Sequence, residues 1–161
     1  MEAVQELTLR PTAKRSTVLK DTNEPTLLLV EDSEDDVFFF MRAFEIAALN
    51  CAVHHSSNGA EAVEFLQAGL NAKPHTLPQW IFLDLKMPVM NGFEVLEWLR
   101  SQTLPAPVPV IVLSGSEHPD DKCRAAELGA TAYLVKPVKV ADLHRFLQDV
   151  CSTNPKVGAQ V

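Results

Sequence analysis

Short hydrophobic runs recur along the chain, and each of them ends at polar residues or at a turn signal. An apolar run of this length is typical of a buried strand, although periodicity alone does not exclude a buried helix. The stretch WIFLDLKMPVMNG, residues 80–92, is the clearest case, because four apolar residues end at Asp84 and a loop with Pro and Gly follows. The pattern predicts strands at residues 26–30, 51–56, 80–83, 110–113 and 131–135.

Apolar residues at helical spacing follow each of these runs, which predicts a helix after every strand. Ser33 and Asp36 have the spacing of a capping box at the start of the first helix. Gly69 is expected to end the second helix, and Gly129 the fourth, which begins at Pro119. The predicted helices cover residues 34–50, 60–69, 93–100, 119–129 and 141–151.

The alternation of strands and helices predicts an α/β fold, in which a doubly wound parallel sheet is covered by helices on both faces. Uninterrupted apolar strands agree with this arrangement, because both faces of such a sheet are buried. In open parallel sheets, ligands bind outside the carboxyl ends of the strands. The residues at those ends are therefore the candidates for function.

Composition narrows the classes of function. The chain has 161 residues, 47% hydrophobic and 22% charged, which suits one compact domain with a hydrophobic core. The predicted domain spans residues 25–151, between a flexible extension of residues 1–24 and a loose tail of residues 152–161. The net charge of −7 argues against nucleic acid or an anionic membrane as a partner.

Signals for export or membrane insertion are absent from the sequence. No apolar run is long enough to span a bilayer, and the N-terminal residues contain no apolar core of a secretory signal. Cys51, Cys123 and Cys151 lie singly in separate segments, which favours free buried thiols in a reducing compartment. These features predict a cytoplasmic protein.

Polar residues of several chemical types follow the predicted strands. Glu31 and Asp32 follow the first strand, Asp84 the third, Ser114 the fourth and Lys136 the fifth. Carboxylates brought together repel one another unless they share a cation, and an all-oxygen site with room for water suits Mg²⁺. An aspartate in such a site can act as a nucleophile and become an aspartyl phosphate, while Mg²⁺ and Lys136 neutralise charge on the transferred group. Ser114 would donate to a phosphoryl oxygen.

Four ordered motifs, LLLVED, FLDLKMPVMNG, VIVLSGS and AYLVKP, resemble those of receiver domains of two-component response regulators. The resemblance covers residues 25–151 and is to the chemotaxis-regulator-like type that has no output domain. It implies a flavodoxin-like receiver fold, with five strands in the order 2-1-3-4-5 and five helices. It also implies a signalling domain that is not an enzyme beyond its own phosphotransfer and dephosphorylation.

The resemblance assigns the phosphoryl and metal sites. Asp84 matches the phosphoacceptor, and Glu31 and Asp32 match the acidic pair that holds Mg²⁺, with Glu31 in place of the more usual Asp. The backbone carbonyl of Lys86 matches the third metal ligand. Lys86 and Ser116 also match the positions that tune the lifetime of the phosphoryl group.

The resemblance also assigns a conformational switch. Ser114 matches the switch hydroxyl, and Tyr133 matches the aromatic residue that moves inward when Ser114 engages the phosphoryl group. Lys136 matches the lysine of the family, and Pro137 matches the proline that follows it in a cis peptide.

The family implies a sensor histidine kinase as phosphoryl donor. Output would pass to a downstream protein target, to a histidine phosphotransfer protein, or into a homodimer formed by the fourth helix, fifth strand and fifth helix. The DSEDD run, the long loop of residues 69–79 and the SEHPDD segment resemble the single-domain receivers paired with bacterial and cyanobacterial phytochromes.

Two other classes of function remain open. A pseudo-receiver would bind a partner without phosphorylation, but the complete set Asp32, Asp84, Ser114 and Lys136 argues against it. In a hydrolase we would expect DxDx[TV], GxSxG or a phosphate-binding G-x-x-x-x-G-K-[ST] loop. The sequence DLK at residues 84–86 lacks the second acid, LSGS around Ser114 lacks the first glycine, and no phosphate-binding loop is found.

Overall fold

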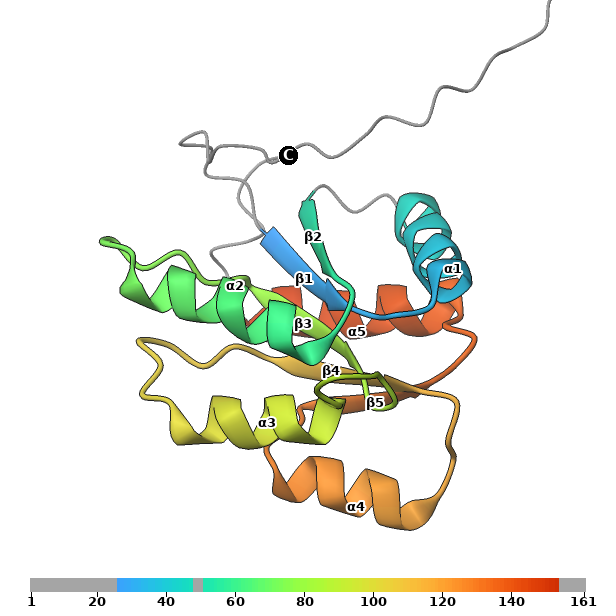
Figure 1. The fold of residues 1–161 in the computed structure, drawn as a ribbon. Helices are drawn as coiled ribbons and strands as arrows, with labels where there is room; N and C mark the ends of the chain where they lie inside the picture. The colour runs from blue at the N-terminus through green and yellow to red at the C-terminus, as the bar shows by residue number, and fades with distance from the viewer. Residues whose placement is uncertain (1–25, 48–50, 154–161) are drawn as a thin grey trace, which may run out of the picture.

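The computed structural model describes residues 26–47 and 51–153, in which five strands alternate with five helices (Figure 1). The strands are β1 (Thr26–Val30), β2 (Ala52–Ser56), β3 (Trp80–Asp84), β4 (Val110–Ser114) and β5 (Ala132–Val135). The helices are α1 (Glu34–Ile46), α2 (Gly59–Asn71), α3 (Gly92–Ser101), α4 (Pro119–Glu127) and α5 (Val140–Thr153). The predicted alternation is confirmed.

The five strands form one parallel sheet in the order β2-β1-β3-β4-β5. β3 lies in the middle and pairs with β1 and β4, and every residue of β3 and β4 is buried. This is the doubly wound α/β order that the resemblance implied.

Successive residues of a strand face opposite sides of the sheet, which divides the core into two hydrophobic clusters. Leu28 and Val30 belong to the cluster that contains Val95 of α3, and Leu27 packs with Phe44 of α1 in the other. In Figure 1, α1 and α5 cover one face of the sheet, and α2, α3 and α4 cover the other. The two layers of helices therefore fix the sheet from both sides.

The two edge strands are less buried than the sequence pattern predicts. Ala52, His54 and His55 of β2 are exposed, and all the residues of β5 are only half-buried. An edge strand has a neighbouring strand on one side only, so less of it is enclosed. The expectation of complete burial is right for β3 and β4 and wrong for β2 and β5.

Gly69 does not end α2, which continues to Asn71, so the predicted end of this helix is wrong. The glycine instead permits a close approach of the following loop. A Cβ atom at Gly69 would overlap the carbonyl oxygen of Thr76, whose N–H donates to the Gly69 carbonyl at 3.1 Å.

α1 ends at Ile46, before its predicted end at residue 50, so that prediction is also wrong. The ends of α4 and α5 follow the sequence signals more closely. α4 begins at Pro119, and Gly129 follows its end with a φ of 96°, as a glycine can readily do. α5 runs to Thr153, slightly beyond its predicted end at residue 151. The predicted extension and the part of the tail from residue 154 onward lie outside the described residues.

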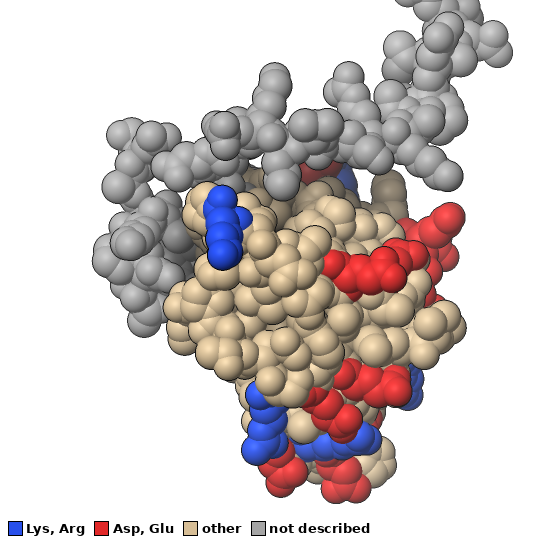
Figure 2. Space-filling view, turned by 60° about the vertical axis from the view of Figure 1, so that its left-hand side comes forward, with Lys and Arg blue, Asp and Glu red and all other residues tan. Residues whose placement is uncertain are grey.

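Basic side chains do not form a continuous surface on the face drawn in Figure 2, where they are scattered and several lie beside acidic ones. Within residues 26–47 and 51–153, no helix is long and apolar enough to cross a membrane. Cys123 on α4 is exposed, so the expectation of a buried thiol is wrong for this residue.

Gly92 allows the loop after β3 to pack against the end of that strand. Its N–H donates to the Leu85 carbonyl at 3.1 Å. A Cβ atom added to Gly92 would overlap the carbonyl oxygen of Asp84. The position of Asp84 therefore depends on the absence of a side chain at residue 92.

We predict that Gly92→Ala lowers the free energy of unfolding by about 1–3 kcal/mol, because the backbone around Asp84 must shift to admit the methyl group. Gly115→Ala is the matched control, since nothing lies within 4 Å of a Cβ atom added there. Urea unfolding measures both variants against the wild type. Equal stability of the two variants would contradict the close packing at Gly92.

Candidate functional site

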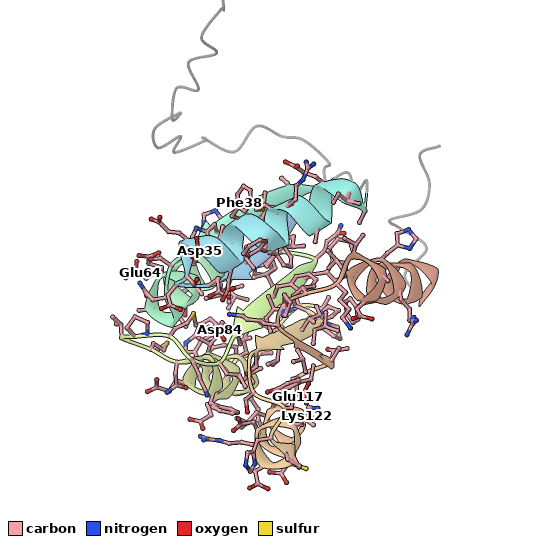
Figure 3. All side chains as sticks on the ribbon, turned by 90° about the vertical axis from the view of Figure 1, so that its right-hand side faces the viewer. Asp35, Phe38, Glu64, Asp84, Glu117 and Lys122 are labelled. Atoms are coloured by element: carbon pink, nitrogen blue, oxygen red, sulfur yellow. The ribbon has the colours of Figure 1, made fainter. Side chains whose placement is uncertain are left out.

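The strand register brings the acidic residues to one edge of the sheet. Val30 of β1 lies beside Leu83 of β3, so Glu31 and Asp84 follow at the same height. The strand order reverses between β1 and β3, and this switch point is where open parallel sheets bind ligands. Figure 3 looks onto this edge, where Asp84 lies between α1 on one side and α4 on the other.

The same register brings Ser114 and Lys136 together on the other side of Asp84. Ser114 pairs with Val135, and the N–H of Lys136 donates to the Ser114 carbonyl at 2.9 Å. The predicted meeting of acids, hydroxyl and lysine at one edge therefore agrees with the geometry.

Three carboxylates form the acidic part of the site. One oxygen each of Glu31, Asp32 and Asp84 lies within 4.8 Å of the other two. Backbone N–H groups hold the two buried members: that of Ser33 donates to Glu31 Oε1 at 3.2 Å, and that of Lys86 to Asp84 Oδ1 at 3.3 Å. Asp32 is exposed, so the cluster is open to solvent on its side.

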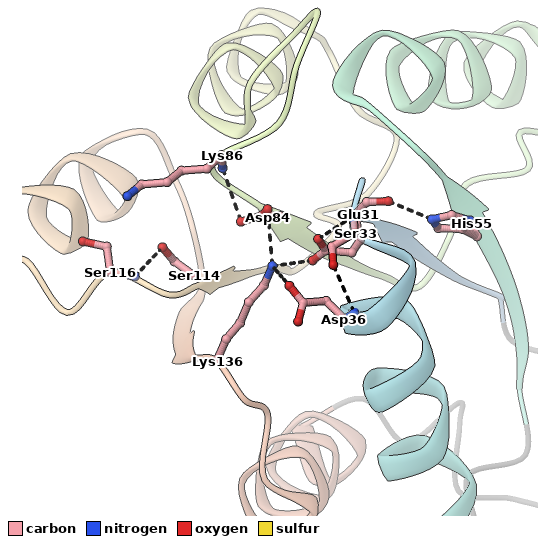
Figure 4. Close-up of polar contacts among 9 residues, drawn as sticks. All are labelled: Glu31, Ser33, Asp36, His55, Asp84, Lys86, Ser114, Ser116 and Lys136. Carbon is pink, nitrogen blue, oxygen red and sulfur yellow. Dashed lines mark hydrogen bonds and ion pairs between the residues drawn. The ribbon is translucent and has the colours of Figure 1, made fainter.

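The ammonium group of Lys136 is the positive centre of the site (Figure 4). Its Nζ lies 2.6 Å from Glu31 Oε2, 2.9 Å from Asp36 Oδ2 and 3.3 Å from Asp84 Oδ2. Only 16% of the lysine side chain is exposed, so solvent screens these ion pairs poorly.

Burial and nearby charges have opposing effects on the pKa of each of these groups, and the net result is a raised pKa for all three. Burial raises the pKa of the Glu31 and Asp84 carboxyls above their ordinary values, and the nearby lysine offsets only part of this effect. Burial alone would lower the pKa of Lys136, but its close contacts with the Glu31 and Asp36 carboxylates and the charge of Asp84 raise it above its ordinary value. Lys136 is therefore a permanent cation.

Asp36 is a member of this network that the sequence analysis missed. Its spacing from Ser33 predicted a capping box, and half of that prediction is confirmed, because the Asp36 N–H donates to Ser33 Oγ at 3.3 Å. The Asp36 carboxylate does not return to the cap and instead accepts from Lys136. No local pattern indicates a contact between residues so far apart in the chain.

His55 is a second contact that the sequence did not indicate. Its Nε2 lies 2.8 Å from the carbonyl oxygen of Glu31, whose N–H donates to the Ser56 carbonyl at 3.0 Å. The edge strand β2 thus holds the Glu31 peptide on both sides, which fixes where the acidic pair leaves the sheet.

The predicted switch residues both contact the backbone of one residue, Ser116. The Ser116 N–H donates to Ser114 Oγ at 3.1 Å, and the Tyr133 hydroxyl donates to the Ser116 carbonyl at 2.8 Å. Ser114 is fully buried, and Tyr133 is half-buried with Lys122 Nζ 5.6 Å from its ring centre. The backbone of Ser116 therefore connects the hydroxyl group near Asp84 to the aromatic residue of β5.

The resemblance also assigned roles to Lys86 and Pro137, and both residues are described in the structure. The Lys86 side chain is exposed next to Asp84, and the Lys136–Pro137 peptide is cis, as the resemblance implied.

The family model of the response regulator receiver domain matches residues 27–148 of this chain, and this match shows the family. The chain belongs to the response regulator receiver family. A receiver domain is a signalling domain of two-component systems, and the likeness of the four sequence motifs is thereby confirmed.

Individual relatives match this receiver domain over most of its length. The probable methanogenesis regulatory protein FilR2 of Methanothrix harundinacea is 34% identical over 134 residues, which cover 83% of this chain and 85% of that protein. Response regulator Rcp1 of Synechocystis is 30% identical over 131 residues, covering 81% and 89%.

Solved structures give the same assignment. The bacteriophytochrome response regulator RtBRR superposes with a TM-score of 0.70 at 35% identity, over 79% of this chain and 78% of that chain. A Mn²⁺-bound form of Rcp1 has a TM-score of 0.65 at 28% identity, over 85% and 97%. The predicted similarity to phytochrome-associated response regulators is confirmed.

The residues present in this receiver domain fit a divalent cation. Carboxylate oxygens with access to water are the ligands that Mg²⁺ prefers. The buried Glu31 Oε2 atom, apart from its ion pair with Lys136, has no hydrogen-bond partner among the described residues. A cation on the open side of the cluster would satisfy this oxygen and reduce the repulsion between Glu31 and Asp84.

We predict that Asp84→Asn raises the free energy of unfolding of the metal-free domain at neutral pH. Because the folded state raises the pKa of Asp84, stability falls as pH rises from the unfolded-state pKa through the folded-state pKa. Each pKa unit corresponds to about 1.4 kcal/mol. Asparagine abolishes this loss, so the variant and the wild type should differ more at pH 8 than at pH 4.

Urea unfolding in the presence of a chelator measures this difference at both pH values. Glu64→Gln is the control, because Glu64 is an exposed acid on α2. A wild type that is more stable than Asp84→Asn at pH 8 would contradict the unfavourable burial of the Asp84 charge.

Proposed function

We propose that this receiver domain accepts a phosphoryl group on Asp84 from a histidine of a sensor kinase, and that the phosphoryl group controls partner binding. The supporting observation is the place of Asp84 at the end of the central strand, beside two further acids and a lysine. Of the carboxylates in the cluster, Asp84 is the one that belongs to the central strand β3, between the acids that follow β1 and Ser114 at the end of β4.

In the transfer, an Asp84 oxygen attacks phosphorus in line while the bond from phosphorus to the histidine nitrogen breaks. The nitrogen keeps the electron pair of that bond and leaves with the kinase. Lys136, 3.3 Å from Asp84 Oδ2, stabilises negative charge on the transferring group. Mg²⁺ bound by Glu31, Asp32, Asp84 and the Lys86 carbonyl would supply further positive charge there.

Ser114 binds the phosphoryl group and transmits its presence to the surface of the domain. When this hydroxyl turns to donate to a phosphoryl oxygen, it gives up the hydrogen bond from the Ser116 N–H. The β4–α4 loop then rearranges, and Tyr133, which binds the Ser116 carbonyl, moves with it. Phosphorylation in this way biases a two-state element, the surface of α4, β5 and α5.

The proposed partners rest on this phosphotransfer chemistry and on the similarity of the chain to phytochrome-associated response regulators. A sensor histidine kinase, of phytochrome type, supplies the phosphoryl group in the cytoplasm. The surface of α4, β5 and α5 binds a downstream protein, a histidine phosphotransfer protein or a second copy of the domain. The domain catalyses only its own phosphotransfer and dephosphorylation, and the complete burial of Ser114 disfavours a serine hydrolase.

Acetyl phosphate tests the phosphoacceptor directly. We expect a Mg²⁺-dependent band on a gel that retards aspartyl phosphate, and its complete loss in Asp84→Asn. A band that persists in the variant would place the phosphoryl group elsewhere. No band in the wild type, together with partner binding that Asp84→Asn leaves unchanged, would support the pseudo-receiver hypothesis instead.

We predict that Lys86→Ala changes the rate of dephosphorylation about threefold to tenfold, on the order of 1 kcal/mol in activation free energy. The exposed side chain lies where water reaches the phosphoryl group, whereas the backbone carbonyl expected to bind metal is retained. Decay of the phosphorylated domain and the Mg²⁺ dissociation constant are measured together. Lys73→Ala, at an exposed loop lysine, is the control. Equal phosphoryl lifetimes for Lys86→Ala and the wild type would refute the prediction.

A further inference from the structure

Lys136 contacts three carboxylates that come from three different elements. Glu31 follows β1, Asp84 ends β3, and Asp36 lies in the first turn of α1. The Asp36 contact is a hydrogen bond of 2.9 Å between residues that are 100 positions apart in the chain. Of these three contacts, the one to Asp36 has hydrogen-bond geometry, whereas those to Glu31 and Asp84 are ion pairs.

The three carboxylates differ in the other groups that the proposed function requires them to bind. Glu31 and Asp84 belong to the acidic cluster with Asp32, whereas Asp36 lies outside it. A cation in that cluster would compete with Lys136 for Glu31, and a phosphoryl group would occupy Asp84. Asp36 is therefore the carboxylate that stays in contact with Lys136 when a cation binds Glu31 and a phosphoryl group occupies Asp84.

We propose that Asp36 is a positioning residue, which holds the Lys136 ammonium from the α1 side and keeps it directed at Asp84. This inference rests on the proposed function of Asp84 and Lys136. A lysine side chain has a flexible four-carbon stem with many rotamers, so a single weak contact would leave its charge poorly placed. Preorganised charge is what stabilises a transferring phosphoryl group.

Asp36 does not compete with the phosphoryl group for the lysine. When a cation takes Glu31, one N–H of Lys136 becomes available for a phosphoryl oxygen while the bond to Asp36 persists. The Asp36 carboxylate is 40% exposed, so it tolerates its charge without a second partner, unlike the buried Glu31. Anchoring and catalysis therefore use different donors of the same ammonium group.

The chain offers a matched pair of substitutions for the test. Asp36→Asn removes the charge but keeps the backbone N–H that Ser33 caps. Asp35→Asn removes one charge from the same helical turn, and Asp35 is an exposed residue of α1 (Figure 3). Both variants weaken the interaction with the α1 dipole alike. Only the first removes a negative charge that contacts Lys136.

Acetyl phosphate labelling at saturating Mg²⁺ gives the kinetic readout. We expect Asp36→Asn to react about tenfold more slowly than the wild type, with a Mg²⁺ dissociation constant within about twofold, as a 1.4 kcal/mol loss of transition-state stabilisation predicts. Asp35→Asn should react at the wild-type rate, and Asp36→Glu should recover part of the lost rate. A rate for Asp36→Asn equal to that of Asp35→Asn, or faster than the wild type, would overturn the proposal.

The side-chain ammonium signal of Lys136 in an ¹H–¹⁵N spectrum gives a second readout that needs no phosphorylation. It is assigned by its loss in Lys136→Arg. The signal should persist in the wild type and in Asp35→Asn and broaden in Asp36→Asn, and an unchanged signal in Asp36→Asn would overturn the proposal. If the wild type takes up no phosphoryl group, the proposed function fails, and this signal alone decides whether Asp36 holds the lysine.

Discussion

The site depends on one ammonium group that neutralises carboxylates buried by the fold. An isolated buried carboxylate is strongly unfavourable, so a carboxylate that the fold buries needs a positive charge close to it. Lys136 meets this requirement for Glu31 and Asp84 at once and adds a contact with Asp36. Since the lysine follows β5 and its partners lie on β1, β3 and α1, the charge balance forms only when the whole fold has closed.

The hydrophobic sheet supplies the rigidity that this balance needs. Every residue of β3 and β4 is buried, because helices pack against both faces of these central strands. Asp84 is therefore held at a fixed height beside Glu31. The acidic cluster lies at the ends of buried strands, whereas Ser116 lies in the loop between β4 and α4.

Two hydrogen bonds at Ser116 link Ser114, at the proposed phosphoryl site, to Tyr133 of β5. Ser114 accepts from the N–H of Ser116, and Tyr133 donates to the carbonyl of the same residue. In the proposed switch, movement of the buried Ser114 hydroxyl toward Asp84 would break its hydrogen bond with Ser116 and so alter the contact of Ser116 with Tyr133. That edge strand is only half-buried, so a change there reaches the surface without disrupting the core.

The sequence by itself determined the strands, the class of fold and the chemical types at the strand ends, since apolar runs and the residues that follow them are local patterns. The similarity of its motifs to receiver domains added strand order and the cis peptide before Pro137. Only the tertiary structure decided that Gly69 serves close packing and that the Asp36 carboxylate binds Lys136. Such contacts join residues far apart in the chain, and their partners are set by strand register and helix placement, which no local pattern records.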